Sequence, residues 1–113
     1  MPYIHTKTNV KITEEKEIAL KSELGKAIAL IPGKTERWLM LNFTDSERMW
    51  FAGENSPTAI LEVELLGSAD DSEYDLLTRK LTEIISAELD IDPSRVYIKY
   101  EEIEHWGWNS SNF

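Results

Sequence analysis

Side chains that favour burial alternate with polar ones along the start of the chain. One face of an extended backbone over residues 2–10 would carry Ile4, Thr6, Thr8 and Val10. The opposite face would carry Tyr3, His5, Lys7 and Asn9. A period of two is typical of a β-strand that is buried on one side only. The pattern therefore predicts a first strand over residues 2–10.

The next segment repeats its apolar residues at helical spacing: Leu20, Leu24, Ala27, Ile28 and Ile31. Thr13 precedes Glu14 and Glu15, which is typical of an N-cap followed by acidic residues in the first turn. The Pro32-Gly33 pair ends the pattern. We therefore expect a helix from about Glu14 to Leu30.

An almost continuously apolar run, RWLMLNF, occupies residues 37–43. Such a run predicts a strand from Arg37 to Phe43 that is covered on both faces. Residues 44–57 contain Asp, Ser, Gly, Asn and Pro around Met49, Trp50 and Phe51. They predict a loop with at most a short strand.

The second half repeats this plan. Residues Ala59–Leu66 and Arg95–Tyr100 predict strands, and Ser72–Leu89 predicts a helix with these inward residues: Tyr74, Leu77, Leu81, Ile84 and Ile85. The joints IPGKTERWLMLNF and IDPSRVYIKYEEI also look alike. Each half is thus a βαβ unit, and we infer an internal duplication, about 2–45 and 58–104, within a single domain of residues 1–113.

Right-handed crossovers make each unit a parallel strand pair with its helix on one face. The predicted fold is α+β, with duplicated βαβ units forming a four-stranded mixed sheet and two helices on one face. A pseudo-twofold axis would place the first strand antiparallel to strand 59–66, with Pro2 near Leu66. The other face would be bare and would carry apolar or aromatic residues such as Tyr97, so other copies of the chain are its simplest cover.

The composition narrows the class of partner. The 113 residues include 21 acidic and 12 basic side chains, a net charge of -9, and no cysteine. This charge argues against a nucleic-acid groove or an anionic membrane surface. The missing cysteines exclude disulfides, thiolate nucleophiles and cysteine-ligated metals. No signal-peptide core or membrane span is readable, so the expected location is cytoplasmic.

The usual catalytic motifs are missing. His5 and His105 form no spaced ligand set, so no metal site is predicted. The five glycines form no nucleotide-binding pattern. The acidic residues at the start of the second helix are expected to cap it: Asp70, Asp71, Glu73 and Asp75. A second acidic run is expected to be exposed to solvent and to have no catalytic role: Glu101, Glu102 and Glu104.

One feature is chemically unusual, a proline directly after the initial methionine. Removal of Met1 is expected because the second residue is small, and it would turn the Pro2 nitrogen into a secondary amine. An α-amino group has a pKa of about 7.7–8.0, which desolvation lowers further, so this amine would be a general base at neutral pH. If Met1 is retained, the nitrogen is an amide and cannot accept a proton.

Three features together make the chain similar to the macrophage migration inhibitory factor family of the tautomerase superfamily. They are Pro2 after Met1, the PSRVYIKY segment at residues 93–100, and the Gly107-Trp108-Asn109 tail that ends in Phe113. The resemblance spans essentially the whole chain. It implies a homotrimer with active sites at subunit interfaces and a cofactor-free enol–keto tautomerase acting on phenylpyruvate-like 2-oxo acids.

The resemblance also assigns roles to individual residues. Pro2 matches the catalytic base, Lys34 the carboxylate-binding lysine, and Leu66 the position whose backbone N–H faces the substrate. Tyr97 falls on the interfacial tyrosine. A lysine ammonium would orient the substrate's acid group and lower the pKa of the amine. An apolar wall would come from three tryptophans, for each of which a packing role is the alternative: Trp38, Trp106 and Trp108.

Two departures from the family pattern matter. Lys99 stands where relatives carry an asparagine that contacts the far end of the substrate. Since Lys99 shares a strand face with Tyr97, we expect it to face the neighbour's pocket. It should favour substrates with an anionic or strongly hydrogen-bonding group at both ends over plain phenylpyruvate. The alternative is that it pairs with a glutamate such as Glu101. Thr58 and Leu61 replace the family's CxxC cysteines, so its thiol-redox chemistry cannot apply.

The family leaves other functions open. The alternative to the enzyme is a cytokine-like protein that binds a receptor, leaves the cell without a signal peptide, and keeps only a vestigial pocket. Partner binding that survives Pro2→Gly would favour that alternative. A third reading uses the same amine for decarboxylation or hydration, and no motif separates it from tautomerisation.

Overall fold

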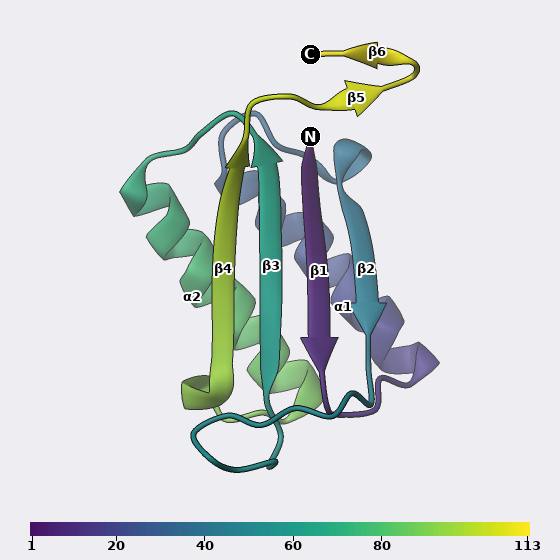
Figure 1. Cartoon of the computed structure of the whole chain (residues 1–113), viewed down its shortest axis with the longest axis vertical. Helices are drawn as coiled ribbons and strands as arrows, with labels where there is room; N and C mark the ends of the chain where they lie inside the picture. Colours follow the sequence, from purple (N-terminus) through teal and green to yellow (C-terminus); the bar gives the residue numbers. More distant parts are fainter.

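The computed structural model describes residues 1–113 as one mixed sheet covered on one side by two helices (Figure 1). The strands are β1 (Pro2–Thr8), β2 (Met40–Thr44), β3 (Ala59–Leu66) and β4 (Val96–Ile103). They lie in the order β2-β1-β3-β4, with β1 parallel to β2, β1 antiparallel to β3, and β3 parallel to β4. This is the predicted α+β fold.

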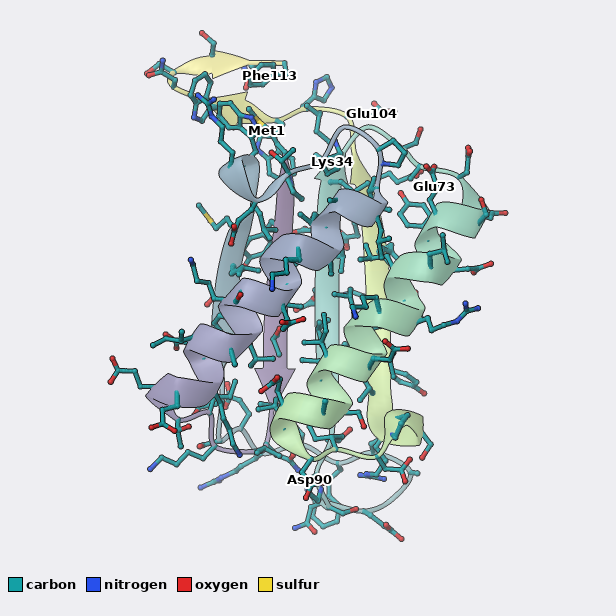
Figure 2. The ribbon with its side chains drawn as sticks, turned by 180° about the vertical axis from the view of Figure 1, so that it is seen from behind. Met1, Lys34, Glu73, Asp90, Glu104 and Phe113 are labelled. Atoms are coloured by element: carbon teal, nitrogen blue, oxygen red, sulfur yellow. The ribbon has the colours of Figure 1, made fainter.

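The helices α1 (Glu14–Ala27) and α2 (Asp71–Leu89) pack side by side against the same face of the sheet (Figure 2). Their starts follow the sequence signals. The Thr13 hydroxyl accepts a hydrogen bond from the backbone N–H of Lys16 at 3.3 Å. Asp70 forms a capping box with Glu73, whose carboxylate accepts the Asp70 backbone N–H at 2.7 Å. Both predicted caps are confirmed.

The core lies between the helices and the sheet. Its residues come from the alternating inward positions of β1 and β3 and from one stripe of each helix: Ile4, Leu61, Val63, Leu65, Leu20, Leu24, Leu77, Leu81 and Ile85, all fully buried. Thr8 and Thr58 are buried too, and each hydroxyl donates a hydrogen bond to a backbone carbonyl at 2.7 Å. These pairings satisfy polar groups that would otherwise destabilise the core.

Several element boundaries differ from the sequence prediction. β1 ends at Thr8, α1 ends at Ala27 before a 3₁₀ turn (η1, Ile28–Leu30), and β4 continues to Ile103. The largest difference is β2. A 3₁₀ turn (η2, Glu36–Trp38) replaces the start of the expected strand, and β2 begins at Met40. β2 is also an edge strand with Met40 66% exposed, so the prediction that it is covered on both faces was wrong for this chain.

The uncovered sheet face is more polar than the sequence analysis expected. Tyr97 is exposed there, as predicted. The middle of the face, however, carries a cluster of charged and titratable side chains: His5, Lys7, Glu62 and Lys99. Alternation alone puts these residues opposite the core, and the Glu62 carboxylate pairs with the ammonium groups of Lys7 and Lys99 on the neighbouring strands.

Two further segments complete the chain. Residues 45–57 form a loop with one isolated bridge, between Phe51 and Glu54, as predicted apart from Thr44, which belongs to β2. After β4, the short strands β5 (Gly107–Trp108) and β6 (Ser111–Asn112) form a hairpin. Figure 1 shows this hairpin lying across the end of the sheet at which β1 begins and β3 ends. No helix is long and apolar enough to cross a membrane.

Candidate functional site

The site is built around the start of the chain. Pro2 is buried at the beginning of β1, opposite Leu65 in the antiparallel register with β3. The backbone N–H of Leu66 donates a hydrogen bond to the carbonyl of Met1 at 3.1 Å. The expected proximity of Pro2 and Leu66 is therefore confirmed, and the antiparallel pairing of β1 with β3 is its cause.

Lys34 reaches the same place from the helix layer. Residues 31–34 form a tight turn in which the Lys34 N–H donates to the Ile31 carbonyl at 3.0 Å. Pro32 is the second residue of this turn and Gly33 is the third. The φ of Gly33 is +81°, a left-handed value that favours glycine at the third position of a turn. The turn directs the half-buried Lys34 side chain inward, and its ammonium donates a hydrogen bond to the Leu66 carbonyl at 2.8 Å.

The amino group at the end of the chain is electrostatically perturbed. Desolvation by burial, followed by the positive charge of Lys34 nearby, lowers the pKa of the Met1 amine from 8.0 to about 6. Both causes disfavour the protonated form. An amine in this position is therefore mostly unprotonated at neutral pH, as a general base must be.

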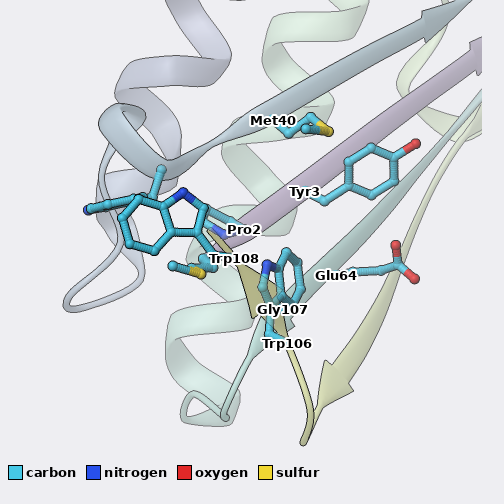
Figure 3. A pocket seen from close by; sticks show the side chains of 9 residues that line it. Pro2, Tyr3, Met40, Glu64, Trp106, Gly107 and Trp108 are labelled. Carbon is cyan, nitrogen blue, oxygen red and sulfur yellow. The ribbon is translucent and has the colours of Figure 1, made fainter. Parts of the chain in front are cut away.

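An open cavity of about 390 Å³ lies directly beside Met1 and Pro2 (Figure 3). Its walls come from the starts of β1 and β2, from η2, from the end of β3 and from the C-terminal hairpin. The lining residues are predominantly apolar: Met1, Pro2, Tyr3, Trp38, Met40, Glu64, Trp106, Gly107 and Trp108. A cavity of this size and lining suits a small ligand with an aromatic or apolar body.

Aromatic rings form one side of this cavity. The rings of Trp38 and Trp108 meet edge to face with their centroids 5.0 Å apart. Phe113 stacks on Trp108 at 6.3 Å, and its N–H donates to the Trp106 carbonyl at 2.9 Å, which holds the tail against the hairpin. Trp38 is nevertheless 38% exposed and Trp108 49% exposed. Both therefore keep aromatic surface available to a ligand.

The structure brings together most of the residues singled out from the sequence. Pro2, Trp38, Trp106 and Trp108 line the cavity. Lys34 and Leu66 adjoin it through their contacts with each other and with Met1.

Two of the candidates lie elsewhere in this chain. Tyr97 packs against Phe51 with the ring centroids 4.6 Å apart, at the opposite end of β4. Lys99 forms an ion pair with Glu62 at 3.0 Å, rather than with the Glu101 that the sequence suggested. Neither lines the cavity of its own chain, so their expected place in a neighbour's pocket stays a prediction.

Sequence reasoning missed three lining residues: Tyr3, Met40 and Glu64. Tyr3 and Glu64 are directly opposite each other on β1 and β3, and Tyr3 is opposite Met40 on β2. Alternation along β3 puts Glu64 on the uncovered face. Only the register between strands shows that this position borders the site.

This arrangement permits proton transfer. The chain contains no group of three or more His, Asp or Glu residues placed to hold a metal ion. The groups present are an amine with a lowered pKa, an ammonium group and a backbone N–H, beside an aromatic cavity. Such a set can remove a proton next to a carbonyl and stabilise the negative charge that develops on oxygen.

Comparisons with known proteins agree with the fold and with the sequence motifs. The family model described as macrophage migration inhibitory factor (MIF) matches residues 1–113. The chain is 30% identical to macrophage migration inhibitory factor of Mus musculus, over 100% of this chain and 99% of that protein. The crystal structure of Leishmania major MIF2 superposes with a TM-score of 0.94 at 30% identity, over 100% of this chain and 97% of that one. A homologue from Prochlorococcus marinus gives 0.84 at 28% identity, with 98% of each chain covered.

Proposed function

The chain belongs to the macrophage migration inhibitory factor family, within the tautomerase superfamily, and on this premise we propose that it is a cofactor-free tautomerase of phenylpyruvate-like 2-oxo acids. The observation that carries the proposal is the place where the chain begins: Pro2 is buried beside an aromatic cavity, and Lys34 lies next to the terminal residue. The aromatic wall suits the ring of such an acid, and Lys34 suits its carboxylate.

The reaction requires the removal of Met1, which makes Pro2 the terminal amine. Loss of Met1 frees the Leu66 N–H and the Lys34 ammonium as well as the Pro2 nitrogen. The Met1 carbonyl accepts the hydrogen bond of the Leu66 N–H, and the Met1 amine lies against Lys34. The processed chain therefore offers a base, a cation and a backbone donor at one end of the cavity.

In the ketonisation direction, the carbon next to the ring must gain a proton and the enol oxygen must lose one. The Pro2 amine takes the hydroxyl proton and the resulting ammonium delivers a proton to carbon, so that the amine is regenerated. Enolisation is the reverse, with the amine removing the proton from carbon. Negative charge on the substrate oxygen is stabilised by the Leu66 N–H, while Lys34 holds the carboxylate in position.

The direct test is turnover of phenylpyruvate by protein whose intact mass shows that Met1 is absent. We expect keto–enol interconversion without added metal or cofactor. Pro2 is buried and becomes the terminal residue once Met1 is gone, and burial and a nearby ammonium both lower the pKa of an amine. We therefore expect kcat/KM to rise with pH as the amine loses its proton, with a midpoint below the ordinary α-amino value of about 7.7–8.0, and then to level off. Processed protein without turnover, or with a rate independent of pH across this range, would contradict the proposal.

We propose further that the working form is a homotrimer, as family membership implies. Three observations support association: the uncovered sheet face, the unpaired edges of β2 and β4, and the exposed Met40 and Tyr97. Light scattering in dilute solution should give three times the chain mass of 13.0 kDa. A stable monomer would argue against both the trimer and a pocket shared between subunits.

A further inference from the structure

β3 carries two glutamates on the uncovered face of the sheet, Glu62 and Glu64. They differ in their surroundings, because only Glu62 forms ion pairs. The Glu62 carboxylate lies 2.9 Å from the Lys7 ammonium and 3.0 Å from the Lys99 ammonium. These hydrogen bonds lower the pKa of Glu62. The negative charge of Glu62 is therefore compensated within the chain, and the same contacts occupy Lys99.

Glu64, two residues further along β3, has no ion-pair partner among the side chains of the protein. Its cross-strand neighbours are Tyr3 on β1 and Glu101 on β4. Burial, and then the neighbouring Glu101 carboxyl, raise the pKa of Glu64, although Lys99 acts in the opposite direction. The local environment thus opposes a negative charge on Glu64, which an added cation or hydrogen-bond donor would relieve.

This uncompensated carboxyl borders the cavity. Glu64 lines it together with Tyr3, on the side of the uncovered face, and Figure 3 shows both side chains away from Trp108. Lys34 belongs to the helix layer on the other face of the sheet. Its ammonium lies at the end of β3, where it donates a hydrogen bond to the Leu66 carbonyl. A ligand whose acid group is held at Lys34 would therefore extend its other end toward Glu64.

Building on the proposed function, we infer that Glu64 is a specificity-determining residue that selects acids with a cationic group remote from the carboxylate. Aromatic 2-oxo acids with an aminoalkyl group on the ring are the corresponding substrate class. A second carboxylate at that end is disfavoured. This differs from the preference for a second anionic group expected from Lys99 in the sequence, because the Lys99 ammonium is held by Glu62 of its own chain.

The test measures binding by acids that cannot tautomerise, so that it does not depend on turnover. The probes are phenylpropanoate, its para-aminomethyl derivative and its para-carboxyl derivative, titrated by the fluorescence of the cavity tryptophans. The native protein should bind the aminomethyl acid about three- to fivefold more tightly than phenylpropanoate, and the dicarboxylate most weakly. In Glu64→Gln the three affinities should lie within about twofold of one another.

Glu101→Gln is the companion variant: it leaves the cavity lining intact and removes the neighbouring carboxyl that raises the pKa of Glu64, so it favours the ionised form of Glu64. This variant should keep the native order of affinities. Equal affinities in the native protein, an unchanged preference in Glu64→Gln, or no binding of any probe would overturn the inference. Phenylpyruvate turnover by the same native sample tests the proposed function separately, since each result can hold without the other.

Discussion

Replacing Pro2 by glycine is expected to lower kcat for phenylpyruvate by about 100-fold or more while changing KM only slightly. Pro2 is buried at the start of β1, and its ring both fixes the direction of the nitrogen and helps to exclude water. Glycine would keep an amine at this position, but a mobile and better hydrated one. The loss should therefore fall on proton transfer and not on binding.

Steady-state kinetics on samples of verified N-terminal mass would check this result. Pro57→Gly is a suitable control, because Pro57 precedes β3 at the end of the sheet remote from the cavity. Alkylation of the terminal amine in the native protein should abolish turnover altogether. Unchanged kinetics after alkylation would refute the role of the amine, and partner binding that survives Pro2→Gly would favour the cytokine-like alternative.

Replacing Lys34 by alanine is expected to have the second large effect, on substrate binding. A hydrogen bond between charged groups contributes about 1.5–3 kcal/mol, so KM should rise by roughly 10- to 100-fold. The pKa of the terminal amine should also increase, because the positive charge of Lys34 helps to lower it. At neutral pH a larger share of the amine would then be protonated, and kcat/KM would fall further.

The pH profile distinguishes this mechanism from simple loss of stability. In Lys34→Ala its rising limb should move to higher pH, whereas Lys34→Arg should keep it near the native position. Lys26→Ala provides the matched control, since Lys26 makes only an exposed ion pair with Glu23. A native KM and an unmoved pH profile in Lys34→Ala would exclude Lys34 from the site.

The fold was largely predictable because its elements are amphipathic. Alternation in β1, and helical spacing in α1 and α2, indicated which side chains are buried. The error over residues 37–43 has a clear cause. Trp38 and Met40 are apolar because they line the cavity, not because a two-sided core covers them. Hydrophobicity alone cannot distinguish these two situations.

The candidate site was predictable only in part. The Met1-Pro2 start, the turn before Lys34 and the tryptophans are local signals, and they indicated the amine, the cation and the aromatic wall. Glu64 carried no such signal. Its role depends on Tyr3 and Glu101, which lie opposite it on the neighbouring strands, and on the hairpin that forms another wall of the cavity.

The sequence by itself determined the order of helices and strands, the faces that they bury and the family to which the chain belongs, because periodicity and short motifs are local properties. The tertiary structure alone decided which charges meet. Strand register pairs Glu62 with Lys7 and Lys99 and leaves Glu64 without a cation beside the cavity. Register is set by packing between segments distant in sequence, so two glutamates that look equivalent along β3 acquire different roles.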